Sequence, residues 1–136
     1  MGTTEATPKP FEKRRFLFVS IDALITDIAW RVAQEGHEVK YFIESPAEKS
    51  TGDGFVPKVD DWESEVAWAD VIVFDDVLGQ GAKAHQLRQD GKAVVGGTPY
   101  TDRLEDDRTF GQEELKKHGI NVIPFQDFDS FDAAID

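Results

Sequence analysis

Polar and small side chains gather directly after the apolar runs of this sequence, where they could line a site for a small molecule. The runs are 16–20, 39–43, 71–74 and 93–95. If these runs are parallel strands, their carboxyl ends meet at one edge of a sheet, which is where ligands bind in open α/β sheets. We therefore predict substrate binding by Ser20, Asp22, Asp75, Asp76, Gly79, Gly81, Gly96, Gly97 and Thr98. The competing explanation is that loops after strands need turn residues for structural reasons alone.

The elements that must position these residues alternate between strand and helix patterns. Apolar spacing predicts helices over 23–34, 62–69, 82–89 and 104–118, a fifth strand over 121–124, and a further helix that begins with Ser130 as its N-cap. This alternation predicts a three-layer, Rossmann-like, doubly wound α/β fold with a mainly parallel sheet of about five strands. The long connection 44–61 is predicted to be functional or mobile, because loops of that length are uncommon.

Nucleotide-binding motifs are weak in this chain. A dinucleotide-binding loop needs G-x-G-x-x-G after the first strand, and the chain has S-I-D-A-L-I-T-D there. Gly79-Gln80-Gly81 is a G-x-G before a helix, and that helix N-terminus could hold an anion. A phospho-receiver domain is an alternative, since Asp22, Asp75 or Asp76, and Thr98 fit its acidic and hydroxyl positions. The chain lacks the Lys that receivers carry after the fifth strand.

Residue types for catalysis and metal binding are sparse. The chain has no Cys and no G-x-S-x-G nucleophile motif, and His37, His85 and His118 do not lie at metal-binding spacings. We therefore assign no catalytic residue and no metal ligand in this chain.

The stretch from residue 91 to 124 contains, in chain order, Gly91, Gly96, Leu104-Glu105, Arg108, Phe110, His118-Gly119-Ile120 and Pro124. In these features it resembles phosphoribosylamine–glycine ligase, an ATP-grasp enzyme family of purine biosynthesis. A weaker similarity begins at residue 15 and includes Gly36-His37-Glu38-Val39. The chain departs from the family by having Asp75-Asp76-Val77 in place of Gly-Pro-Glu, and no Gly-rich loop after the first strand.

The resemblance implies the pre-ATP-grasp domain of a carboxylate–amine ligase that is inactive on its own. In such ligases ATP phosphorylates a carboxylate, and an amine attacks the acyl phosphate. ATP and Mg²⁺ would serve the full-length ligase through downstream ATP-grasp domains of the same polypeptide, and we expect no cofactor on this chain alone. Arg108 corresponds to a basic residue that can reach ATP phosphates, or it forms a surface ion pair with Glu105 or Asp107. The alternative function is a non-catalytic Rossmann-like binding module.

Composition limits the partners and the domain organisation. The chain has 136 residues and a formal net charge of −12, so its surface would repel nucleic acid. It has neither an apolar run that could span a bilayer nor a secretory signal, which predicts a cytoplasmic protein with no membrane association. We expect a flexible tail over 1–14, the α/β domain over 15–129, and the start of a following segment over 130–136.

The acidic, Asp-rich composition predicts that stability depends on salt. If the charge of −12 is an adaptation to saline conditions, self-repulsion destabilises the folded state until salt screens it. Thermal melts in increasing KCl should therefore show a rising melting temperature. A melting temperature that stays level or falls would contradict this halophilic interpretation.

Overall fold

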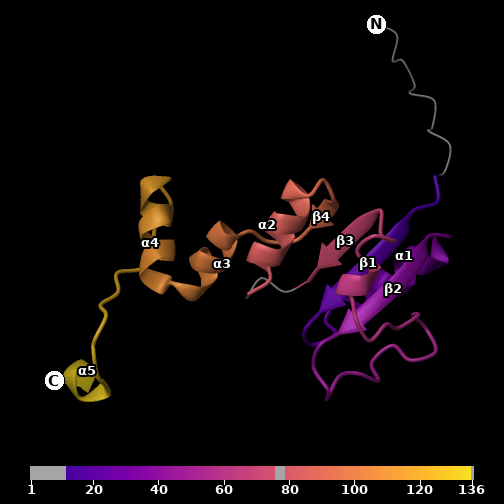
Figure 1. Cartoon of the computed structure of the whole chain (residues 1–136). Helices are drawn as coiled ribbons and strands as arrows, with labels where there is room; N and C mark the ends of the chain where they lie inside the picture. The colour runs from indigo at the N-terminus through magenta and orange to yellow at the C-terminus, as the bar shows by residue number, and fades with distance from the viewer. Residues whose placement is uncertain (1–11, 76–78, 136) are drawn as a thin grey trace, which may run out of the picture. The chain divides into compact units, whose positions relative to one another are not determined.

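The computed structural model describes residues 12–75 and 79–135, which fall into two compact units divided between Asp102 and Arg103 (Figure 1). The first unit contains β1 (Arg15–Ser20), α1 (Thr26–Gln34), β2 (Glu38–Ile43), β3 (Val71–Phe74), α2 (Gly81–Gln89) and β4 (Ala93–Val95). A single 3-10 turn, η1 (Glu63–Glu65), precedes β3. The helix α3 (Pro99–Asp106) contains the boundary, and α4 (Arg108–Lys117) and α5 (Phe131–Ile135) lie in the second unit.

The sheet is parallel and has the order β2-β1-β3-β4. Its central strand β1 is buried on both faces, because successive side chains of a strand point to opposite sides. Phe18 packs in one cluster with Ala29 of α1, whereas Leu17 and Val19 pack in the other with Ala84 of α2. The two helices therefore cover opposite faces, and the predicted three-layer, Rossmann-like α/β fold is confirmed.

The predicted fifth strand is wrong. Residues 121–124 have no strand partner in the part of the chain that the structure describes, and the sheet there has four strands. The segment is short, Pro124 has no amide hydrogen to donate, and Ile123 is 84% exposed. Its apolar residues therefore lack the burial that a strand would give them.

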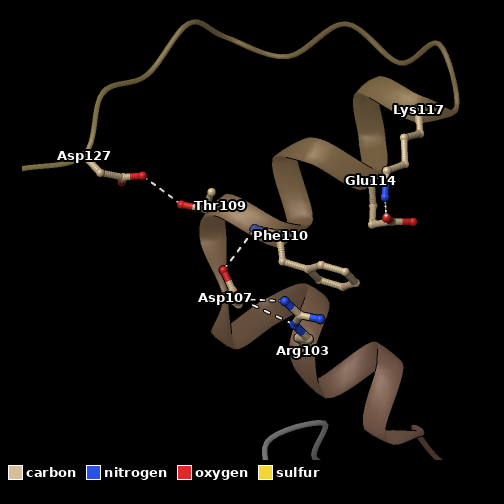
Figure 2. A network of polar contacts seen from close by, with 7 residues as sticks. All are labelled: Arg103, Asp107, Thr109, Phe110, Glu114, Lys117 and Asp127. Atoms are coloured by element: carbon tan, nitrogen blue, oxygen red, sulfur yellow. Dashed lines mark hydrogen bonds and ion pairs between the residues drawn. The ribbon is translucent and has the colours of Figure 1, made fainter.

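The predicted helix over 104–118 is two helices. Asp107 leaves the helical conformation and accepts a hydrogen bond from the Phe110 amide at 2.9 Å, which makes it the N-cap of α4 (Figure 2). Arg103 donates to the same carboxylate at 3.4 Å and stacks 3.8 Å from the centre of the Phe110 ring. The Phe110 amide, and after it the Arg103 guanidinium, lowers the pKa of Asp107. Gly111 belongs at this corner, because a Cβ there would lie 2.7 Å from the Leu104 carbonyl oxygen.

Other boundaries differ by smaller amounts. The first helix begins at Thr26 rather than Ala23, whose φ is +62°, and the predicted helix 62–69 is reduced to η1. The capping role of Ser130 is confirmed by a 3.2 Å hydrogen bond from the Ala133 amide to its hydroxyl oxygen. No helix in the described ranges is both long enough and apolar enough to cross a bilayer.

The end of the long connection and the end of the tail both contact the β2 region. Tyr41 donates its amide to the Pro57 carbonyl and accepts from the Val59 amide, both at 2.9 Å, so the end of the 44–61 connection runs beside β2. Within the predicted tail, residues 1–11 lie outside the described residues. Lys13 forms an ion pair with Glu38 at 2.9 Å, and the Arg14 amide donates to His37 Nδ1 at 3.1 Å.

A salt bridge joins the first residue of β1 to the residue that precedes β3. Arg15 donates to Asp70 from its amide at 2.9 Å and from its guanidinium at 2.6 and 3.2 Å, and the Asp70 amide donates to the Arg15 carbonyl. The side-chain hydrogen bonds from Arg15, followed by its backbone amide, lower the pKa of Asp70 to about 2. The pair thus joins the chain before β3 to the start of β1.

This salt bridge predicts a specific acid sensitivity. Because the folded pKa of Asp70 lies below its ordinary value, the stabilisation is present above about pH 4 and is lost as pH falls through about 2. In Arg15→Gln the Asp70 carboxyl should titrate nearer its ordinary pKa, as measured by carboxyl carbon NMR. Arg31→Gln, which removes an exposed guanidinium paired with Glu35 on α1, is the control and should leave the Asp70 titration unchanged. An Asp70 titration unchanged by Arg15→Gln would contradict the assignment.

Candidate functional site

The carboxyl edge of the sheet brings together a buried hydroxyl and a carboxylate. Val19 pairs with Phe74 in the register of β1 and β3, so the next residues, Ser20 and Asp75, also face each other. The Ser20 hydroxyl is fully buried and donates to Asp75 Oδ2 at 2.6 Å. The structure therefore places two predicted site residues in direct contact, with Ser20 beneath the surface orienting the half-buried Asp75.

A second buried hydroxyl lies on β2 and was not identified from the sequence. Tyr41 is fully buried, and its hydroxyl lies 3.0 Å from Thr26 Oγ1 on α1. Because Thr26 donates to the Ala23 carbonyl at 2.8 Å, Tyr41 is the donor to Thr26. Burial raises the pKa of Tyr41, which keeps this phenol protonated at neutral pH. The contact anchors the first turn of α1 to the sheet near the edge.

The start of α2 is closed by a carboxylate of the chain itself. The Gly81 amide donates to Asp102 Oδ2 at 2.9 Å, so Asp102 supplies the anion that the sequence suggested for this helix N-terminus. A Cβ at Gly81 would lie 2.4 Å from the Thr98 carbonyl, which explains why glycine is required here. Two predicted site residues, Gly81 and Thr98, are therefore brought together, and the contact between them is tight packing of the backbone.

The turn after β4 is held from behind by α2. Arg88 Nη1 donates to the Gly97 carbonyl and Nη2 to the Gly96 carbonyl, both at 2.7 Å, with longer contacts of 3.3 and 3.4 Å to the Val94 carbonyl. Gly96 packs closely on Phe74, since a Cβ at Gly96 would lie 3.1 Å from the Phe74 Cβ. Arg88 and Asp102 are thus residues of the edge that sequence reasoning missed, since nothing in a helical pattern indicates which turn a helix residue will contact.

The remaining predicted site residues are less engaged. Asp22 is exposed, and among the residues described it has no hydrogen bond to the others of the set. Gly79 is exposed with φ +74° and open space around its α-carbon. Asp76 lies outside the described residues. The edge that can be described therefore consists of Ser20, Asp75, Gly81, Gly96, Gly97 and Thr98.

Arg108 belongs to the second unit, at the start of α4. It lines a cavity of about 330 Å³ with Leu104, Glu105, Gly111, Gln112 and Leu115. The salt bridges among the described residues do not include Arg108, and Asp107 is paired with Arg103 instead. Figure 2 also shows Thr109 donating to Asp127 at 2.8 Å and Lys117 paired with Glu114, so α4 contacts the segment that follows it.

In the ranges 12–75 and 79–135, no three His, Asp or Glu side chains are grouped so that they could hold a metal ion. The edge presents the Asp75 carboxylate, backbone amides, and glycines that allow close approach of the backbone.

Removing the Ser20 hydroxyl should destabilise the fold. Ser20→Ala deletes a 2.6 Å hydrogen bond to a carboxylate, a class of bond that contributes about 1.5–3 kcal/mol to the free energy of unfolding. Urea unfolding measures this change. Ser64→Ala is the control, because the exposed Ser64 hydroxyl donates only to the Asp61 carbonyl and its loss should change stability by no more than about 0.5 kcal/mol. Equal effects of the two substitutions would contradict a buried Ser20–Asp75 bond.

Comparisons with known proteins reveal a shared fold. No family model matches the chain, and no curated protein sequence matches it. Among solved structures, N5-carboxyaminoimidazole ribonucleotide synthetase from Thermotoga maritima matches with a TM-score of 0.65 and 18% identity, over 90% of this chain and 35% of the synthetase. The Staphylococcus aureus synthetase complexed with ADP matches with a TM-score of 0.63 and 20% identity, over 90% of this chain and 35% of the synthetase.

Rossmann dehydrogenases match over less of the chain. The UDP-N-acetylglucosamine 3-dehydrogenase GnnA from Acidithiobacillus ferrooxidans has a TM-score of 0.54 and 16% identity, over 82% of this chain and 38% of the enzyme. At these identities the likeness shows the fold alone. The chain spans about a third of the length of the synthetases, and its fold is the Rossmann-like α/β arrangement that both groups of enzymes contain.

Proposed function

We propose that this chain is the N-terminal, substrate-side domain of an ATP-dependent carboxylate–amine ligase of the ATP-grasp type. The observation that carries the proposal is the extent of the likeness to the two ribonucleotide synthetases. That likeness covers 90% of this chain, with TM-scores of 0.65 and 0.63. The likeness to the GnnA dehydrogenase covers 82% of this chain, with a TM-score of 0.54. The residues between 91 and 124 that resemble phosphoribosylamine–glycine ligase support the same class of enzyme. In its narrower form, the proposal is that the complete protein resembles that particular ligase.

The proposed role of the edge is to bind the amine-bearing substrate. Asp75 would accept hydrogen bonds from the amine, and Ser20 would act as a positioning residue through its 2.6 Å bond to Asp75. Gly96, Gly97 and Thr98 would form the neighbouring wall, since β4 lies next to β3 in the sheet. Asp22, Asp76, Gly79 and Gly81 complete the proposed substrate side.

The proposal requires further domains for the chemical step. The ADP in the Staphylococcus aureus structure supports the use of ATP by a complete ligase, with Mg²⁺ as its expected companion. The downstream ATP-grasp domains would follow the segment that begins at residue 130. Arg108 is the one residue of this chain proposed to reach ATP, and the complete protein is proposed to be cytoplasmic.

Ligand titration of the ¹⁵N-labelled chain tests this function. We expect 5-aminoimidazole-4-carboxamide ribonucleotide, a stable aminoimidazole ribonucleotide, to cause saturable amide shifts at 20–22, 75–81 and 96–98. Mg·ATP at micromolar concentration should cause none, because one exposed charge pair from Arg108 supplies about 0–1 kcal/mol, whereas even millimolar affinity needs about 4 kcal/mol.

Matched variants make the titration specific. Asp75→Asn should weaken ribonucleotide binding about tenfold, because a neutral acceptor replaces a charged one in the hydrogen bond to the amine. Asp60→Asn removes the same charge from an exposed site in the long connection and should leave binding unchanged. Shifts that saturate at micromolar Mg·ATP or NAD⁺, in place of the ribonucleotide, would instead favour a non-catalytic Rossmann-like binding module.

A further inference from the structure

Arg88 is directed to backbone carbonyls in this acidic chain. Its guanidinium donates only to backbone carbonyls, those of Val94, Gly96 and Gly97, and has no salt bridge with a carboxylate in the described ranges. The formal net charge of the chain is −12, so carboxylates are in excess, yet none of those described pairs with this guanidinium. Its positive charge therefore remains available to the turn that it holds.

The planarity of the peptide bond determines which groups this turn presents. In a trans peptide the carbonyl of one residue and the amide hydrogen of the next point in opposite directions. Because the Gly96 carbonyl points to Arg88, the Gly97 amide hydrogen points away from α2. The Gly97 carbonyl also points to Arg88, and accordingly the Thr98 amide points away and donates to Thr101 Oγ1 at 2.7 Å.

The two amides differ in that one is already used. The Thr98 amide is bound to Thr101, whereas the hydrogen bonds among the described residues leave the Gly97 amide without an acceptor. A guanidinium bound to the carbonyl of the same peptide unit polarises that unit, which makes its amide a stronger donor. Gly97 is half-buried, so part of this residue is exposed at the edge.

The neighbouring carboxylate is directed elsewhere. Val73 pairs with Val95 in the register of β3 and β4, which places Asp75 beside Gly97 along the edge. Asp75 turns its Oδ2 to the Ser20 hydroxyl on β1, the strand on the other side of β3. The edge therefore has an acidic end over β1 and β3 and a donor end over β4.

We propose that the Gly97 amide, backed by Arg88, binds an oxyanion of the ligand, either a phosphate or a carboxylate group. The proposal rests on the proposed function for its placement of the ligand at the carboxyl edge, and it adds an anion-binding element there. Arg88 is a positioning residue in this element, because it acts through the peptide between Gly96 and Gly97. The binding is noncovalent, and the ligand keeps its charge.

Titration with inorganic phosphate, and separately with acetate, tests the anion site by ¹⁵N amide shifts. The amide of Gly97 should move downfield and saturate with at least one of the two anions, and the stronger of them identifies phosphate or carboxylate as the preferred group. Arg88→Ala should weaken that binding about tenfold. Arg31→Ala, which removes an exposed guanidinium paired with Glu35 on α1, should leave it unchanged.

A second pair of variants keeps the test decisive if Arg88→Ala unfolds. Gly97→Pro removes the amide hydrogen and should abolish anion binding, whereas Gly97→Ala keeps the hydrogen and should retain it. No shift at Gly97 with either anion, or equal binding by Gly97→Pro and Gly97→Ala, would overturn the proposal. Anion binding at Gly97 with no tighter binding of the ribonucleotide would support this site and reject the ligase function.

Discussion

The burial of β1 on both faces is the constraint on which the rest of the first unit depends. Leu17, Phe18 and Val19 leave no side of this strand exposed, so both faces must be covered, as they are in parallel sheets flanked by helices. The same arrangement brings the carboxyl ends of four strands to one edge. A ligand site at that edge is therefore a consequence of how the chain buries its most apolar segment.

The strands were predictable because their signal is local. Short apolar runs bounded by polar residues predicted four strands with boundaries that agree within one residue, and Gly36, Gly91 and Gly119 adopt the positive φ expected after helices. The break at Asp107 was missed because the helical pattern continues across it. What divides α3 from α4 is a side-chain hydrogen bond, and apolar spacing does not register it.

The candidate site was predictable in its location and not in its internal contacts. Residues after strands could be assigned to the edge from the order of elements alone. The sequence could not predict which of these residues are held by internal contacts. Ser20, Gly81 and Thr98 form hydrogen bonds with residues that lie far away in the sequence or on a later helix. Arg88 and Asp102 carry no sequence signal, because their partners are backbone groups whose positions depend on how α2 and α3 pack.

The last strand of the sheet also bears on how the protein behaves in solution. β4 has only three residues, and the Val94 carbonyl is occupied by Arg88. A long edge strand with free carbonyls and amides is a template on which another chain can add a strand, and short edges remove that template. The contact that shapes the turn after β4 thereby limits edge-to-edge aggregation of the sheet.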